Sequence, residues 1–138
     1  MSLHDLATRI APQELTSFAA NQLKSLLINV NGVELTMLCS SDGFELASFE
    51  KLQTTNKSKL AAVSSSILAM VQAFMNELDL KGCQNITLDA DNGKSILVSL
   101  PHPQFPMIAL IITSQDVLLG QLLYNTKKIS QQITEYNI

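Results

Sequence analysis

Two Asx-Gly pairs constrain the fold of this chain more than any other feature of its sequence. Asp42-Gly43 and Asn92-Gly93 each lie between stretches in which apolar and polar residues alternate. Such pairs favour β-hairpins with type I′ turns, whose two central residues need positive φ angles. We therefore expect two hairpins, and with them an antiparallel sheet.

The spacing of apolar residues places helices around these hairpins. It predicts a first helix that has Pro12 in its first turn and ends at Asn31-Gly32, and a long second helix that ends at a glycine cap, Gly82. A final amphipathic helix follows Gly120. Five strands are expected between the helices, the last of them buried at the centre of the sheet, at residues 33–40, 44–49, 86–90, 94–100 and 107–113.

The composition fits one domain with little charged surface. Of the 138 residues, 46% are apolar and 15% are charged, against about 25% charged in an average soluble domain. Such a chain either has a large core or covers apolar surface by self-association. We expect an N-terminal extension at residues 1–12, one domain at residues 13–134 and a C-terminal tail at residues 135–138.

Several kinds of partner are not expected. The net charge of −3 and only nine Lys and Arg residues disfavour binding to nucleic acid, which needs basic patches. No apolar run approaches the roughly 20 residues of a membrane-spanning helix, and the N-terminus lacks the pattern of a signal peptide. The sequence therefore predicts a cytoplasmic protein without membrane insertion.

The sequence contains no convincing catalytic, metal or cofactor site. Cys39, Cys83 and the two histidines have no metal-ligand spacing, and there is no phosphate loop or nucleophile elbow. The remaining candidates have simpler interpretations. Asp89 and Asp91 fit a polar strand face, and His102 is expected to be an exposed loop residue. Lys59 near Ser64, Ser65 and Ser66 does not have the order of a serine–lysine nucleophile pair.

The second helix carries no charge between Lys59 and Glu77. Its large apolar residues fall within one arc, which is expected to be the core face: Leu60, Val63, Ile67, Leu68, Met70, Val71, Phe74, Met75 and Leu78. The opposite face is small and uncharged, where a free surface helix would carry Lys and Glu: Ala62, Ser65, Ser66, Ala69, Gln72, Ala73 and Asn76. Either the domain itself covers this second face, or, as we favour, a partner packs on it.

These features together resemble the Roadblock (dynein light chain) family across residues 13–134. The similar segments are the helix ending in Asn31-Gly32, the strand-turn-strand LCSSDGFELAS, the long small-residue helix, the strand MIALIIT and the segment LLGQLL. A basic residue often found after that last segment is absent, with Tyr124 in its region. The resemblance implies a profilin-like α+β fold with a five-stranded antiparallel sheet in the order 2-1-5-4-3. One helix would cover one face of this sheet, and two helices would cover the other.

The resemblance also implies a function in protein interaction. Family members dimerise by pairing their third strands and packing their second helices, which adds Asn85, Thr87 and Asp89 to the expected homodimer interface. They are not enzymes, and they bind small Ras-like GTPases in signalling, polarity or motility. The alternative is a small-molecule sensory domain of the PAS or GAF type. That domain would need a pocket beneath the sheet, and only five Phe, two Tyr and no Trp are available to line it.

Overall fold

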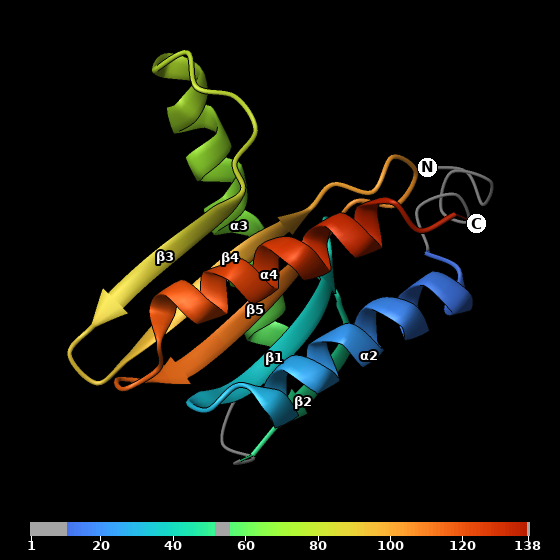
Figure 1. Ribbon diagram of the computed structural model, residues 1–138. Helices are drawn as coiled ribbons and strands as arrows, with labels where there is room; N and C mark the ends of the chain where they lie inside the picture. Colours follow the sequence, from blue (N-terminus) through green and yellow to red (C-terminus); the bar gives the residue numbers. More distant parts are fainter. Residues whose placement is uncertain (1–10, 52–55, 138) are drawn as a thin grey trace.

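The computed structural model describes residues 11–51 and 56–137 as one layered α+β domain (Figure 1). The elements follow the expected order of helix, two strands, helix, three strands and helix. With the labels of Figure 1, they are α2 (Gln13–Asn29), β1 (Val33–Ser40), β2 (Glu45–Glu50), α3 (Lys57–Glu77), β3 (Asn85–Ala90), β4 (Gly93–Leu100), β5 (Met107–Ser114) and α4 (Leu119–Thr134).

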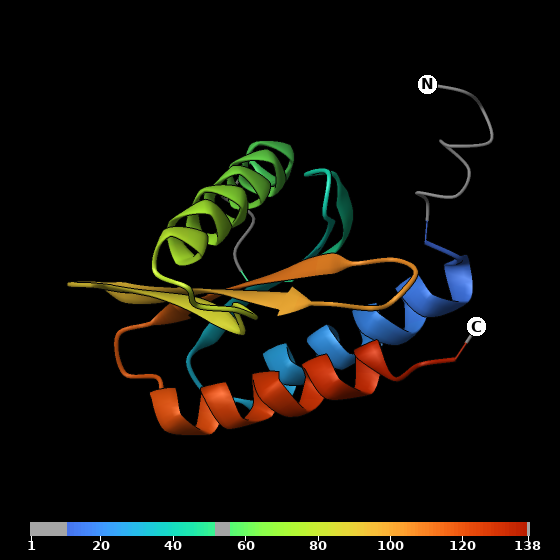
Figure 2. The same cartoon turned by 90° about the horizontal axis from the view of Figure 1, so that it is seen from above.

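The five strands form one antiparallel sheet in the order β2-β1-β5-β4-β3. Seen from above, α3 lies over one face of the sheet, and α2 and α4 lie side by side over the other (Figure 2). Both the strand order and the division of the helices confirm the expected fold class. The strands β2 and β3 are the two edges of the sheet.

The central strand β5 is buried along most of its length, as its apolar sequence predicts. Side chains that alternate along it enter two separate cores. The α2/α4-side core contains Leu23, Leu122 and Ile133 among its fully buried side chains, with Ala109 and Ile111 of β5. The α3-side core is smaller and includes Ile108 and Leu110 of β5.

The two hairpin turns differ from the expected type I′ geometry. At the first, Gly43 has a φ of +94°, whereas Asp42 does not have a positive φ. The N–H of Gly43 donates to the carbonyl of Ser40, and a bulge follows in the β1–β2 ladder, as in a three-residue hairpin loop. At the second, Asn92 does not have a positive φ either, and Gly93 already belongs to β4.

Gly93 is needed for close strand packing. A Cβ atom at this position would collide with the carbonyl oxygen of Thr113 on β5. The Asn-Gly pair therefore predicted the hairpin correctly for a reason that differs from the one expected. The glycine allows β4 to approach β5, because any side chain there would strike the neighbouring backbone.

Helix α3 ends earlier than the expected cap at Gly82. It ends at Glu77, and Asp79 takes the left-handed conformation, with a φ of 56°. The N–H of Leu80 donates to the carbonyl of Met75 over 2.9 Å, which is the hydrogen bond of a Schellman motif. Aspartate tolerates this conformation better than most residues, so a sequence rule that looks for glycine places the end too late.

The expected core face of α3 is wrong in part. The helix buries only Ala61, Ser64 and Leu68. Four members of the expected core arc are exposed instead: Val63 at 45%, Met70 at 65%, Phe74 at 64% and Leu78 at 52%. The reason is visible in Figure 1, where the C-terminal half of α3 projects beyond the ends of β3 and β4 and has no sheet beneath it. We call this part, residues 69–77, the overhang.

Candidate protein-protein interface

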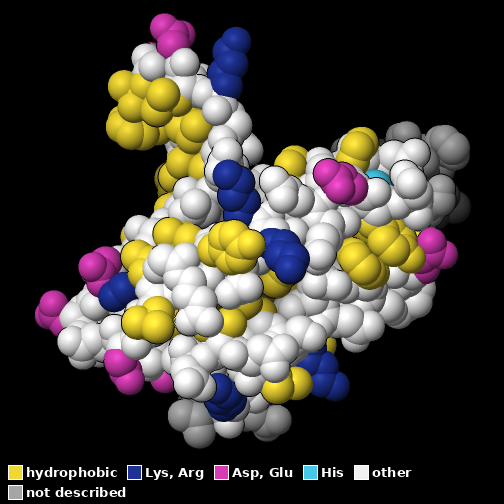
Figure 3. All heavy atoms as spheres, in the orientation of Figure 1, with side chains coloured by type: hydrophobic (Ala, Val, Ile, Leu, Met, Phe, Trp, Pro, Cys, Tyr) yellow, Lys and Arg dark blue, Asp and Glu magenta, His cyan; other side chains and the backbone are white. Residues whose placement is uncertain are grey.

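One flank of α3 presents large apolar side chains that nothing in the described chain covers. It consists of Val63, Met70, Phe74 and Leu78, which we call the outer flank. In Figure 3 hydrophobic side chains gather on the part of the molecule that projects from the body. Monomeric proteins rarely leave contiguous apolar surface of this kind uncovered. The outer flank is therefore the strongest candidate for a functional surface.

The outer flank faces the β3 edge of the sheet. The opposite flank of α3 is held against the β1–β2 turn, where the hydroxyl of Ser65 donates to the carbonyl of Ser41 over 2.7 Å. The backbone of Ala62 also lies against this turn, since a Cβ atom at Gly43 would come within 3.3 Å of its Cα. Because β2 and β3 form opposite edges, we infer that the outer flank points towards β3.

The structure places the predicted interface residues at the surface, where most are exposed and two are half-buried. On α3, Ser65 is half-buried and bonded to the β1–β2 turn, and six residues are exposed: Ala62, Ser66, Ala69, Gln72, Ala73 and Asn76. On β3, Asn85 and Asp89 are exposed and Thr87 is half-buried. Their role at an interface stays a prediction.

The outer flank was missed because its residues were assigned to the core. The spacing along this side of α3 is four, three and four residues, from Val63 through the half-buried Ile67 to Met70 and Phe74. This is the pattern of a helix–helix seam. A helix of 21 residues is also about 31 Å long, more than an eight-residue strand of about 26 Å. Both signals were available in the sequence.

The edge strand β3 adds apolar surface next to this flank. Ile86 pairs with Leu97, and Leu88 pairs with Ser95. Since Leu97 belongs to the α3-side core, Ile86 and Leu88 lie on the same face of the sheet as α3. Leu88 is 55% exposed. An open strand edge beside uncovered apolar side chains is a template for pairing with another chain.

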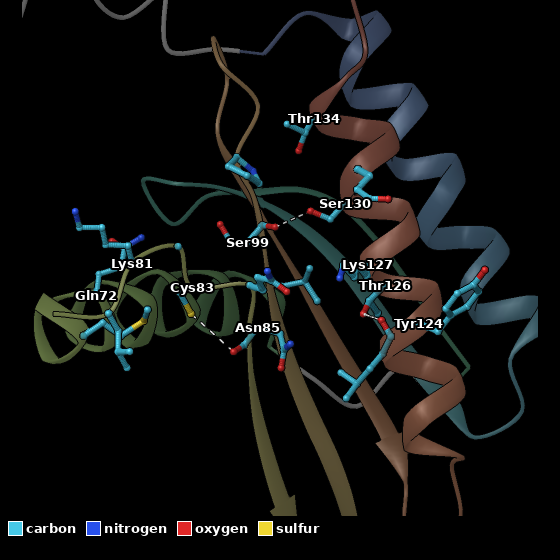
Figure 4. Close-up of a pocket in the computed structure, with 18 of the residues that line it drawn as sticks. Gln72, Lys81, Cys83, Asn85, Ser99, Tyr124, Thr126, Lys127, Ser130 and Thr134 are labelled. Atoms are coloured by element: carbon cyan, nitrogen blue, oxygen red, sulfur yellow. Dashed lines mark hydrogen bonds between the residues drawn. The ribbon is translucent and has the colours of Figure 1, made fainter. Parts of the chain in front are cut away.

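A groove of about 1000 Å³ lies on the other side of the overhang, between α3 and α4 (Figure 4). Its walls come from the α3–β3 connection and from α4. Its floor comes from the beginning of β3 and the end of β4, with Asn85, Val98 and Ser99. Lys81 and Lys127 lie on opposite walls. The sequence pattern did not predict this groove.

Three of the residues considered for chemistry are buried or make other contacts. Asp89 pairs with Lys94 across the hairpin over 3.0 Å. Ser64 is buried, and the hydroxyl of Ser66 donates to the carbonyl of Ala62 within its own helix. In residues 11–51 and 56–137, no group of three or more His, Cys, Asp and Glu side chains could hold a metal ion.

His102 is buried, contrary to the expectation of an exposed loop residue. It is 5% exposed. Its Nδ1 accepts hydrogen bonds from the backbone N–H groups of Gln104 and Phe105, and its Nε2 lies 2.9 Å from the carbonyl oxygen of Tyr136. This pattern requires the neutral ring with a proton on Nε2. His102 therefore ties the β4–β5 loop to the end of α4, where Tyr136 stacks on Phe18.

The two cysteines differ in reactivity. Cys39 is fully buried in the α3-side core. Burial, with a smaller contribution from the charge of Glu45, raises the pKa of its thiol from 9.0 to about 11. Cys83 is a free thiol of intermediate exposure that lines the groove. Because the thiolate is the reactive form, Cys83 is the thiol that a reagent reaches in the folded protein.

Helix α3 also has the length and composition of a membrane-spanning helix. It has 21 residues and a mean hydropathy of 1.3, with 17% of its most apolar window buried. Length and composition alone are a weak indication, because core helices of soluble proteins share them. Since Ala61, Ser64 and Leu68 of this helix pack on the sheet, we interpret α3 as part of the folded domain.

The family model and the solved structures that match this chain agree with each other. A family model described as Roadblock/LC7 domain matches residues 19–101, more than half of the chain. No curated protein sequence matches at a significant level. Similar solved structures include MglB from Myxococcus xanthus, with a TM-score of 0.79 at 14% identity, covering 91% of this chain and 92% of that chain.

Two further solved structures have a similar fold. The gliding protein MglB from Thermus thermophilus has a TM-score of 0.76 at 17% identity, covering 91% of this chain and 92% of that chain. An IclR homologue from Microbacterium hydrocarbonoxydans, complexed with 4-hydroxybenzoate, has a TM-score of 0.57 at 11% identity, covering 97% of this chain and 72% of that chain. These likenesses establish the fold. On the family match, the chain belongs to the Roadblock/LC7 domain family.

Proposed function

We propose that this protein is a non-enzymatic homodimeric interaction module that regulates or scaffolds a small Ras-like GTPase in bacterial-type signalling, polarity or motility. Roadblock/LC7 domains are in general non-catalytic regulatory domains. One observation carries the proposal, namely the uncovered outer flank of α3 beside the open edge of β3. One neighbour in structure, a gliding protein, supports the connection to motility.

The arrangement of this surface fits a two-fold dimer. If two β3 strands pair edge to edge, antiparallel, each copy keeps the same contacts and no second surface is needed. Such pairing brings the two outer flanks together on one face of a continuous sheet, because each flank faces its own β3 edge. Leu88, which is 55% exposed, then lies under the paired helices. The alternative, packing through the small-residue face, uses Ala69 and Ala73.

The GTPase part of the proposal rests on the family and on the surface that a dimer would offer. Two joined sheets and paired helices can provide the roughly 800 Å² per partner of a standard interface. The chain would act by ordering the switch loops of the GTPase itself. Its only arginine, Arg9, lies outside the described residues, and no cluster of side chains that could hold a metal ion occurs within them.

A pair of phenylalanine variants tests the dimer. Phe74 on the outer flank is 64% exposed, and Phe44 on the β1–β2 turn is 69% exposed. Phe74→Glu should dissociate the dimer, since an unpaired charge buried in an interface costs several kcal/mol. Phe44→Glu should leave the dimer intact. Sedimentation velocity at micromolar concentration measures both, and a monomeric wild-type protein at high concentration would refute the dimer.

Nucleotide-dependent binding tests the GTPase separately. The dimer should bind a small Ras-like GTPase of the same organism more tightly in the GTP state than in the GDP state. Biolayer interferometry with the two nucleotide states measures this difference, with Phe74→Glu as the monomeric comparison. If the dimer forms but binds no such GTPase in either state, the regulatory role is wrong while the dimer stands. Loss of GTPase stimulation in Arg9→Ala would refute action through the switch loops.

The rival function, a small-molecule sensory domain, has less support. The IclR homologue shows that a similar fold occurs in a protein that was crystallised with a small aromatic acid. However, the space between the sheet and helices α2 and α4 holds no volume for a ligand in the described residues. The groove beside α4 is open to solvent. A thermal shift of several degrees with small metabolites would favour this rival.

A further inference from the structure

The groove between the overhang and α4 has a charge that differs from that of the whole chain. The protein carries a net charge of −3, yet two lysines and one carboxylate, Glu135, line the groove. Lys81 and Lys127 lie on opposite walls (Figure 4). Neither of them forms an ion pair in residues 11–51 and 56–137. The groove therefore favours an occupant with carboxylate groups.

The groove is too apolar to be explained by an inorganic anion. Met75 and Leu80 lie on the overhang side, Val98 lies at the floor, and Leu123 lies on the α4 side. An occupant that uses the whole groove must place apolar side chains against these four residues and carboxylates near the lysines. This division of side chains is that of an amphipathic segment.

The dimensions of the groove fit a helix. Its α4 wall runs from Leu123 to Glu135, which corresponds to about 18 Å, or three helical turns. On this face of the sheet, α2 packs over β1 and β2, and α4 packs over β4. Two helices at a packing distance of about 10 Å leave the outermost strand β3 beside α4 without cover. A further helix can therefore lie alongside α4.

We propose that this groove is a docking site for an acidic amphipathic helix of a protein partner. The helix lies along α4, with its apolar side chains against Leu80, Val98 and Leu123 and its carboxylates near Lys81 and Lys127. The site is separate from the outer flank of α3. It remains open if β3 strands pair, because that pairing takes place in the plane of the sheet. The inference therefore does not depend on β3 pairing or on the GTPase, although Gln72, Asn76 and Asn85 of the predicted dimer interface also line the groove.

One further feature of the groove wall supports a polar partner. Thr134, near the end of α4, lines the groove, and its Oγ1 atom is the one buried side-chain oxygen or nitrogen without a hydrogen-bond partner in the described residues. Buried polar atoms without partners are uncommon in native proteins.

The groove contains its own reporter for the experiment. Cys83 lines it, whereas Cys39 is fully buried and its pKa is raised to about 11. A docked helix should therefore slow the alkylation of Cys83 by N-ethylmaleimide. Mass spectrometry follows this reaction without any change to the sequence. The reporter distinguishes binding in the groove from binding elsewhere on the surface.

The probe is a fluorescein-labelled amphipathic peptide of about three helical turns, with leucines on one face and glutamates on the other. A second peptide replaces each glutamate by glutamine. We expect fluorescence anisotropy to show binding of the acidic peptide that weakens with salt, and Cys83 to be protected from alkylation. The Lys81→Glu/Lys127→Glu protein should bind about tenfold more weakly, from two reversed charge pairs.

The matched control changes the net charge by the same amount outside the groove. Lys59 and Lys128 are exposed and do not line it, so Lys59→Glu/Lys128→Glu should lose less than about twofold. Circular dichroism checks that both double variants fold. The proposal is overturned by equal losses in the two double variants, by equal affinity for the glutamine peptide, or by absent binding. It is overturned too if Cys83 stays reactive, if a co-purified small molecule already protects it, or if Lys81→Glu/Lys127→Glu changes the oligomeric state of the protein alone.

Discussion

The two faces of the sheet are covered to different extents by the same chain. On one face, α2 and α4 bury a core that includes Leu15, Leu23, Leu122 and Ile133 with almost no exposed surface. On the other face, the single helix α3 buries three of its own residues and leaves its outer flank in solvent. The sequence of α3 is more apolar than those of α2 and α4, so apolar content does not explain this difference. What differs is whether the sheet lies beneath the helix. The apolar side chains of α3 that lie beyond the sheet stay exposed, because no other part of the described chain covers them.

The largest expected effect comes from the well-covered face. Leu122 is fully buried between α4 and the sheet, so Leu122→Ala should lower the free energy of unfolding by about 2–5 kcal/mol. Leu68→Ala on α3, at the border of the overhang, should cost less, because its surroundings can collapse around the missing side chain. Urea denaturation in the Phe74→Glu background measures both without a contribution from dimer dissociation. If Leu68→Ala lowers the free energy of unfolding as much as Leu122→Ala or more, the α3 face is not the less well packed of the two.

The next effect separates the two flanks of α3. Met70 lies on the outer flank and is 65% exposed, whereas its neighbour Ala69 lies on the small-residue face. Met70→Glu should raise the dissociation constant of the dimer at least about 100-fold, since burying an unpaired charge costs several kcal/mol. Ala69→Arg and Ala73→Glu should have a smaller effect. Analytical ultracentrifugation over a concentration series decides between the flanks, and the reverse order would favour packing through the small-residue face.

The two edges of the sheet should then differ in hydrogen exchange. The outward amides of β3, near Asn85, Thr87 and Asp89, are expected to be protected in the dimer, because an edge that pairs with a second strand gains hydrogen bonds. Amides at the outer edge of β2 should exchange at the same rate in dimer and monomer. Exchange followed by mass spectrometry in the wild-type protein and in Met70→Glu measures this difference. Fast exchange along β3 in a stable dimer would mean that the two copies associate through helix packing without strand pairing.

The smallest expected effect concerns Cys39, which is buried in the α3-side core. Burial raises the pKa of Cys39 to about 11 from 9.0, so the folded protein keeps this proton where the unfolded chain loses it. The resulting stability is complete below pH 9 and should be lost as the pH rises through 11. Cys39→Ala should remove this part of the pH dependence. If urea denaturation between pH 8 and pH 11 shows the same decline in both proteins, the thiol is not its source.

Much of the fold could be predicted from local sequence signals. The boundaries of α2 and β1 followed from apolar spacing and from Asn31-Gly32, and the burial of β5 followed from the run MIALIIT. The details of the turns could not be predicted as well. Gly93 is required by the carbonyl of Thr113 on another strand, and Asp79 ends α3 in a conformation that sequence rules assign to glycine. The first depends on a neighbouring strand that local sequence does not specify. The second rests on a local hydrogen bond, from the N–H of Leu80 to the carbonyl of Met75, at a residue type that the glycine rule passes over.

The candidate interface stays a prediction, but the structure changes which residues of α3 it favours. The uncharged stretch of α3 drew attention to this helix. The large residues of the outer flank were nevertheless assigned to the core, because periodicity tells which residues share a helix face and not what lies opposite that face. His102 shows the reverse error, since a position between two prolines looks exposed although Tyr136, far along the chain, covers it.

The sequence by itself determined the order of elements, the antiparallel sheet and the apolar character of α3, since these depend on residues within a few turns or one hairpin. Only the tertiary structure decided which apolar residues are buried. Burial depends on where a helix lies relative to the ends of the strands, and α3 extends past them (Figure 1). The groove between Lys81 and Lys127 is likewise a product of that overhang, because two segments far apart in the sequence form its walls.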